Sequence, residues 1–529
     1  MADTYSTQFR TCETTGLKVH LPGERLFYVH AVTAVVALLT GGVMALLIAL
    51  TRWPAVHLLP ADLFYRFITA HGMNMLVFWI VFFEMAGLIF ASTAVLGSRL
   101  PAVWFGWLNY ALMLGGALLT NYMIFTGQAD VMFTSYPPLK ANPNYYLGII
   151  LFAVGALLAC FHFMATLVVA KKEGYHKGSY PLFTFGILIA VILAIFTLLA
   201  GAATYIPTWL WAMGFIDSID PSLYRLGFWG FGHSAQQINL AAMVSIWYLI
   251  GTLSVGAVPI NEKFSRGAFL LYLLGINVAS VHHLLVDPGL SASFRIFNTS
   301  YVIYAATIGS MIHAFSIPAA IEVAQRAKGY TNGLFEWLTK APWSNPAFSG
   351  MALSVVIFGF GGGVTGVTQG VEQINIMSHN TLRIPGHFHV TVVGGTSLAF
   401  MALTYYALPL VMRRKIIGET WAKYQPWMFG IGISIFATGM SFAGILGVPR
   451  RHYDVTFSSA IFQVPFSATA TTMLGLLGIG AIIAFTALLI FCLIAALTAF
   501  FGERIEPKME PHFPPYLKDG SVEVAAVAG

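Results

Sequence analysis

Six of the fifteen histidines in this 529-residue chain lie inside or at the edges of long apolar runs. An ionisable side chain in such a segment is costly and usually has a function. Neutral imidazoles are good transition-metal ligands, so a shared metal site would account for all six. A hydrogen-bonded core histidine is the alternative for any single one, but six would each need a buried partner. The six are His71, His233, His282, His283, His387 and His389.

The composition places these histidines in a membrane protein. The chain is 57% hydrophobic and 9% charged, with a mean hydropathy of +0.76, whereas a soluble domain carries about 25% charged residues. This excludes disorder, a disulfide scaffold and nucleic-acid binding. Three widely spaced cysteines fit neither a disulfide framework nor a cysteine metal site. The C-x-x-C-H motif of covalent heme attachment is absent from the sequence.

Runs of about 20 apolar residues can span a bilayer, and the sequence contains about twelve of them. We predict an all-α polytopic bundle forming one domain over 1–529, with tails at 1–25 and 503–529. Most lysines and arginines fall on the side of these tails, which places both termini in the cytoplasm. The first tail lacks a signal-peptide core, so the first run is a retained span. The predicted spans are 26–50, 62–96, 102–127, 143–172, 180–213, 224–258, 265–286, 292–325, 347–371, 381–412, 424–447 and 467–502.

This topology brings the six histidines to a similar depth in the outer half of the membrane. His387 and His389 point about 200° apart on a helix, which suits two separate centres. His71, on another helix, could pair with either. The adjacent pair His282–His283 lies near a helix end, so both could reach one ion, with His233 as a third ligand. Three imidazoles suit copper, zinc or non-heme iron, and one or two suit heme iron.

Four stretches give the chain a resemblance to subunit I of the heme-copper oxidase superfamily, along nearly its whole length. Together they are specific, although any one alone would be weak. The loop Tyr136-Pro137-Pro138-Leu139 and the Pro-Gly-His-Phe-His sequence are most similar to the B-type branch. The stretches are His71-Gly72-Met73-Asn74-Met75, His282-His283 followed by Asp287-Pro288-Gly289, Pro385-Gly386-His387-Phe388-His389, and Val448-Pro449-Arg450-Arg451.

The resemblance implies two hemes, with heme b expected at the low-spin site, and one copper ion. Fixed cations near the outer rim can pair with heme propionates. The alternative for Arg450 and Arg451 is that they anchor the chain to lipid headgroups. The alternative for His379 is that it is a solvated loop residue. The implied roles are His71 and His389 as axial ligands of the low-spin heme, His387 as ligand of the high-spin heme, His233, His282 and His283 as copper ligands, and Arg450, Arg451 and His379 beside the propionates.

The chain departs from the family at the active-site tyrosine. Oxygen-reducing A and B branches carry it four residues after the first copper histidine, where this chain has Gln237, and the C-type position is Ile276. Splitting O–O in one step takes four electrons, and a phenol can supply the one that the metals lack; an amide cannot. Coupling two NO molecules to N2O and water takes only two electrons. The sequence therefore predicts a nitric oxide reductase, with Gln237 donating a hydrogen bond to bound NO.

Other departures concern the second metal and the protons. Residues 226–257 contain no aspartate or glutamate that could complete a non-heme iron site, so we predict copper. Glu84 is the alternative ligand for the second metal, but we interpret it as bundle-facing and protonated or hydrogen-bonded. Asn375 stands where many relatives have an aspartate and Arg383 replaces an apolar residue, which suggests weak or absent proton pumping.

The resemblance also implies a single proton path from the cytoplasm. In the predicted span 292–325, helical spacing places Ser310, His313 and nearly Ser316 on one stripe. Structural hydrogen bonding is the alternative for each member. The residues of this path are Tyr248, Ser310, His313 and Ser316.

The chain contains no cupredoxin-like segment, so electrons must enter from another chain. The family implies a second subunit with a copper centre, or a cytochrome c, on the outer face. Lipid and a gaseous substrate are the other expected partners, in the plasma membrane of a bacterium or archaeon. An oxygen reductase with an unrecognised donor is the first alternative, and a twelve-helix secondary transporter the second.

Overall fold

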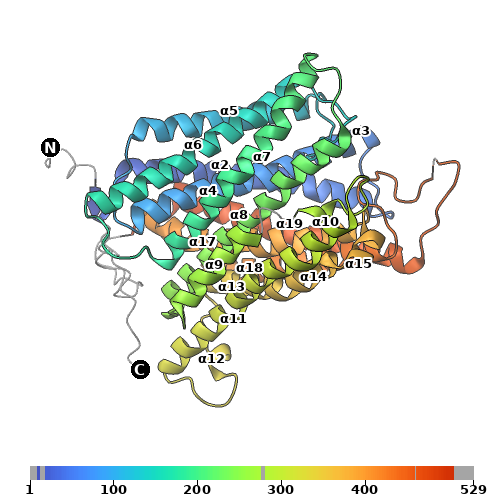
Figure 1. Cartoon of the computed structure of the whole chain (residues 1–529). Helices are drawn as coiled ribbons and strands as arrows, with labels where there is room; N and C mark the ends of the chain where they lie inside the picture. The colour runs from blue at the N-terminus through green and yellow to red at the C-terminus, as the bar shows by residue number, and fades with distance from the viewer. Residues whose placement is uncertain (1–8, 12–17, 276–279, 459, 506–529) are drawn as a thin grey trace.

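Long apolar helices form nearly all of the protein in the computed structural model, which describes residues 9–11, 18–275, 280–458 and 460–505 (Figure 1). Among these residues, eleven helices are long and apolar enough to cross a membrane. The predicted all-α polytopic bundle is therefore confirmed. The eleven are α2 (Leu21–Arg52), α3 to η2 (Ala61–Ala94), α5 (Val103–Phe125), α6 (Pro143–Lys172), α7 (Leu182–Met213), α8 (Pro221–Val255), α10 to α11 (Ala292–Ala327), α13 to α14 (Pro346–Gly370), α16 to α17 (Arg383–Met412), α18 (Glu419–Ile445) and α19 (Ala468–Phe501).

The predicted span 265–286 has a different form. Its first part is the helix α9 (Glu262–Gly275), and residues 276–279 lie outside the described residues. The histidine pair lies on the short 3-10 helix η3 (Val281–His283). The expectation that the pair occupies the end of a spanning α-helix is therefore wrong. A 3-10 turn has 3.0 residues per turn and a poorer hydrogen-bond geometry, which suits a short segment that turns side chains into a site.

Several spans contain π-helical turns close to the candidate ligands. The π-helix η1 (Met73–Trp79) begins two residues after His71, and η6 (His389–Ser397) begins at a candidate ligand itself. Single π-helical turns inside α-helices occur frequently at functional sites, because they shift the face on which the following side chains lie.

Small residues bring α18 and α19 into close contact. A Cβ atom at Gly480 would lie 2.3 Å from the backbone nitrogen of Phe436, and one at Gly439 would lie 2.6 Å from that of Leu477. Helices in lipid associate through such small residues, because backbones can then pack directly. The contact positions the Phe436 ring 5.0 Å from the ring of His389.

The two ends of the described chain lie at one face of the bundle. A hairpin of β1 (Phe9–Thr11) and β2 (Lys18–His20) precedes α2, and Arg10 bonds to Glu24 and to the carbonyl of Leu410. Arg414 forms a bridge with Arg504 at the same end of α17. This agrees with tails on one side, whereas the assignment of that side to the cytoplasm remains a prediction. The first span begins at residue 21, inside the predicted tail 1–25.

Candidate functional site

Two histidines from different spans face one another as a pair. The rings of His71 on α3 (Ala61–Gly72) and His389 are 8° from parallel, with centroids 6.2 Å apart. The Nδ1 atom of His71 lies 3.0 Å from Gly41 O and that of His389 lies 2.7 Å from Pro385 O. Each Nδ1–H can thus donate to a carbonyl, which leaves Nε2 free as a ligand. A metal–nitrogen bond is about 2 Å long. Two such bonds, together with the distance from each ring centre to its Nε2 atom, add up to about this separation. The pair could therefore hold one iron ion between the two rings.

The cavity around this pair fits a flat apolar group with an acidic edge. It offers ≈ 140 Å³ to the centres of water molecules, and its lining includes both rings, Phe388, Arg450 and Arg451. Its polar surface is small. The two arginines are the only charged members of the lining besides Arg52, whose guanidinium holds the backbone of residues 449–452.

The arginines form a half-buried cationic cluster. Within the described residues, Arg450 and Arg451 have no ion-pair partner, whereas Arg225 pairs with Asp287 at 2.5 and 2.9 Å. Burial, together with Arg451, lowers the pKa of Arg450 to about 9. Burial and the nearby Arg450 likewise lower the pKa of His379 to about 4. Half-buried arginines without an ion-pair partner can bind carboxylates, and heme propionates would supply these here.

Three other histidines converge on a second point. The candidate ligand atoms of His233, His282 and His283 all lie within 4.8 Å of one another. His233 Nδ1 is 3.2 Å from His283 Nε2, and the rings of His233 and His282 are 4.2 Å apart at 85°. The first comes from α8 and the other two from η3. Three imidazole nitrogens in this arrangement suit a copper ion.

Side chains that the sequence analysis did not assign to the copper site hold this group in place. The Trp229 ring lies parallel to that of His283, with centroids 3.7 Å apart, and its Nε1 donates to the Tyr136 hydroxyl at 2.7 Å. Asn375 donates from Nδ2 to His282 O at 2.8 Å. Trp229 lies one helical turn before His233, which is a signal that sequence could have given. The contact between Asn375 and His282 left no signal in the sequence, because it joins segments far apart in the chain.

His387 lines the same cavity as His233 and His282, two of the three histidines. Its Nδ1 is 2.8 Å from Thr365 Oγ1, and a Cβ at Gly366 would lie 3.2 Å from its Cε1. One cavity of ≈ 140 Å³ is lined by His387, His233 and Gln237. An iron ion on His387 and a copper ion on the three histidines would therefore adjoin one reaction space.

Gln237 contacts the outer edge of the copper site. Its Nε2 lies 3.0 Å from His233 Nε2, and its Oε1 is buried with no hydrogen-bond partner in the described part of the chain. Tyr272 and Tyr248, on α9 and α8, form their hydrogen bonds with residues other than the three histidines. The Tyr272 hydroxyl is 3.3 Å from Ser310 Oγ, and that of Tyr248 is 2.9 Å from His313 Nδ1.

The four residues of the predicted proton path lie together. Tyr248 contacts His313 and is within hydrogen-bonding reach of Ser316, and Ser310 lines the reaction cavity. The structure adds Ser265, which accepts from Tyr248 at 3.1 Å, and the bond of Tyr272 to Ser310. Sequence analysis missed these two because α9 lies beside α8 and α11 (Ile303–Ala327) only in the folded chain.

The fold defines a multi-pass membrane protein, and its histidine groups could hold metal ions within the bundle. The chain belongs to the cytochrome c and quinol oxidase polypeptide I family, which matches residues 25–486. Members of this heme-copper oxidase family are oxidoreductases that bind two hemes and copper, and the three-histidine group is consistent with the copper site. The secondary transporter has no support from this result.

Individual relatives are distant. The chain is 28% identical to cytochrome c oxidase subunit 1 of Thermus thermophilus over 76% of this chain and 70% of the relative. It is 25% identical to quinol oxidase subunit 1 of Bacillus spizizenii, over 81% of this chain and 66% of the relative. A solved structure described as a heme-copper terminal oxidase dimer has the same fold, with a TM-score of 0.86 and 24% identity, covering 94% of this chain and 90% of that one.

Proposed function

We propose that this chain is the catalytic subunit of a membrane-bound nitric oxide reductase. His71 and His389 would hold a low-spin heme of type b, His387 a high-spin heme, and the three-histidine group a copper ion. When bound, these groups would store and deliver the electrons. Arg450, Arg451 and His379 would hold the propionates.

The contact between Gln237 and His233 carries the choice of substrate. When Nδ1 of His233 binds a metal, its Nε2 carries a proton and needs an acceptor. The oxygen of Gln237 then turns to this N–H, and its amide nitrogen faces the reaction cavity. From there it would donate to the oxygen of bound NO. No phenol occupies this place to supply an extra electron.

The stoichiometry fits this set of residues. Two NO, two electrons and two protons yield N2O and water, so the protein must supply protons and no electrons of its own. Ser310 lines the reaction cavity and bonds to Tyr272, while His313 bonds to Tyr248. We propose that these residues, with Ser316, pass protons toward the cavity.

Reduction of O2 is the second candidate. The names of the relatives favour it, because the two reported above are called cytochrome c oxidase and quinol oxidase. In this case the fourth electron must come from a source other than Gln237.

For either reaction, electrons would arrive from a second subunit with a copper centre or from a cytochrome c. The complex would lie in the plasma membrane of a bacterium or archaeon.

The experiment compares the two gases on the purified complex. Anaerobic NO consumption with stoichiometric N2O formation, faster than O2 uptake under the same donor, is the expected result. Elemental analysis should give, for this chain, two iron ions (one in each heme) and one copper ion, in addition to the metal of the electron donor. O2 uptake well above NO consumption would replace this function by the second candidate, and extra iron without copper would reject the metal assignment.

A further inference from the structure

A charged residue stands one helical turn before the candidate ligand of the high-spin heme. Arg383 begins α16 (Arg383–Phe388), and His387 follows four residues later on the same face of this helix. His389 comes six residues after Arg383 and lies on a different face. The resemblance to the heme-copper oxidase superfamily leads us to expect an apolar residue in place of Arg383, so the guanidinium group needs a reason of its own.

The guanidinium group of Arg383 lies against α14 (Gly363–Gly370), the helix that also holds His387. Its Nη2 donates to Thr368 Oγ1 at 2.6 Å, and the Thr368 hydroxyl donates to Thr365 O at 2.9 Å. The hydroxyl of Thr365 is in turn 2.8 Å from His387 Nδ1. The cation is therefore bonded to the same short helix as the partner of the candidate heme ligand.

The positive charge of Arg383 has no counter-ion in the part of the chain that the structure describes. The side chain is half-buried, and its Nε is buried without a hydrogen-bond partner among these residues. None of their ion pairs includes Arg383. The charge acts electrostatically on the His387 imidazole. Because no carboxylate of the described residues neutralises the guanidinium group, its field extends into the second cavity.

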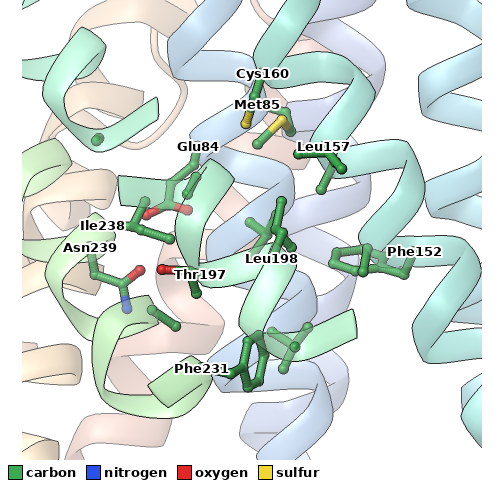
Figure 2. Close-up of a pocket in the computed structure, with 18 of the residues that line it drawn as sticks. Glu84, Met85, Phe152, Leu157, Cys160, Thr197, Leu198, Phe231, Ile238 and Asn239 are labelled. Atoms are coloured by element: carbon green, nitrogen blue, oxygen red, sulfur yellow. The ribbon is translucent and has the colours of Figure 1, made fainter. Parts of the chain in front are cut away.

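Glu84 shows that an ionisable side chain without an ion pair need not carry a charge. It lies on α4 (Ile80–Ile89) and is 8% exposed. Figure 2 shows Glu84 and Asn239 close together at a largely apolar cavity, where the amide nitrogen of Asn239, once turned to Glu84, donates to its Oε1 at 2.9 Å. A carboxyl group in such surroundings is stable in its neutral form. A guanidinium group does not lose its proton in a protein, so Arg383 keeps its charge.

A fixed cation beside a heme ligand changes the equilibrium between oxidised and reduced iron. Reduction lowers the charge of the iron site by one, so a nearby positive charge favours the reduced form. Two unit charges about 10 Å apart, at an effective dielectric constant of about 20, interact strongly enough to change this equilibrium about tenfold. The effect should be larger at His387 than at His389, because Arg383 shares a helix face with His387 alone of the two.

We propose that Arg383 is a positioning residue for electrons: its charge raises the reduction potential of the high-spin site, so that electrons collect at the reaction cavity. One electron moves from the low-spin to the high-spin iron, and no bond of Arg383 forms or breaks. The inference rests on the proposed function only in requiring a heme on His387, and it is the same for reduction of NO or of O2.

The test is an anaerobic redox titration of the full complex without either gas, in which absorption spectra follow both hemes. Arg383→Gln removes the charge and can keep the hydrogen bond to Thr368. At a fixed potential, the ratio of reduced to oxidised high-spin heme should fall about 10-fold, which is a midpoint lower by about 59 mV for one electron. The low-spin heme should shift less. Arg383→Lys keeps the charge and is the matched control, with a midpoint close to wild type.

An unchanged high-spin midpoint in Arg383→Gln would overturn the proposal. An equal fall in Arg383→Lys would do so too, because the shape of the side chain rather than its charge would then matter. If Arg383→Gln does not retain its hemes, Arg383→Leu takes its place in the same titration. A wild type without a high-spin signal contradicts the proposed function, whereas a wild type with this signal and a variant with the same midpoint contradicts this inference alone.

Discussion

The two histidine-lined cavities of this protein differ in the placement of their histidines and in the groups that hold them. His71 and His389 occupy both sides of one cavity and are held by the backbone carbonyls of Gly41 and Pro385. His387 lines the other cavity and is held by a side-chain hydroxyl, and the remaining lining includes the imidazoles of His233 and His282 and the amide of Gln237. The first arrangement would supply two protein ligands to one iron ion, and the second would supply one.

Under the proposed function, this difference would separate the site of electron transfer from the site of the reaction. A metal with both axial positions filled binds no substrate, and rigid backbone partners keep its geometry constant. A metal with an open position can bind a small gas, and the surrounding side chains then determine what happens to it. The polar residues proposed to deliver protons accordingly adjoin the second cavity through Ser310.

The largest effects are expected when one candidate ligand from each cavity is removed in turn and the two variants are compared. His387→Ala should lower turnover more than about 100-fold, since loss of even an outer partner of a ligand costs roughly 10- to 100-fold. It should keep the low-spin heme spectrum. His71→Ala should lose the low-spin signal instead. Optical and electron paramagnetic resonance spectra check both, and a retained high-spin signal in His387→Ala would contradict the assignment.

Proton delivery should affect only the second cavity. His313→Leu removes the partner of Tyr248, so turnover should fall roughly 10- to 100-fold as a general acid–base group is lost. Reduction of the low-spin heme by the electron donor should remain at the wild-type rate. Stopped-flow spectroscopy measures both in one sample. Unchanged turnover would remove His313 from the path, and Thr307→Val, a nearby hydroxyl on the same helix, is the control.

Much of this fold was predictable, because a bilayer admits few solutions. The span 143–172 was predicted to the residue, since lipid requires about 20 apolar residues in a helix that satisfies its own backbone. The separation of His387 and His389 into two cavities also followed from helix geometry. The 3-10 helix at His282–His283 did not, because its form depends on contacts such as that of Asn375 with His282 O.

Gln237 should determine rate and substrate in the second cavity. Gln237→Leu removes the donor to bound NO and leaves the Nε2–H of His233 unpaired, which should lower NO turnover about 10-fold. Gln237→Glu keeps an acceptor for His233 but loses the amide N–H groups, so it should retain copper while NO turnover falls. N2O formation and metal content check these outcomes. Wild-type NO turnover in both variants would show that Gln237 is not a donor to the substrate.

The smallest expected effect concerns the partner of His387. Thr365→Val keeps the shape of the side chain and removes its hydroxyl, at a cost of about 1 kcal/mol for the lost hydrogen bond, or about fivefold in a rate or equilibrium. Thr365→Ser should behave as wild type. The frequency of the iron–histidine stretch in resonance Raman spectra should change at the high-spin heme alone. No side-chain substitution can remove the partner of His71 in this way, because that partner is a backbone carbonyl. An unchanged iron–histidine stretch in Thr365→Val would mean that the difference in partners between the two cavities has no chemical consequence.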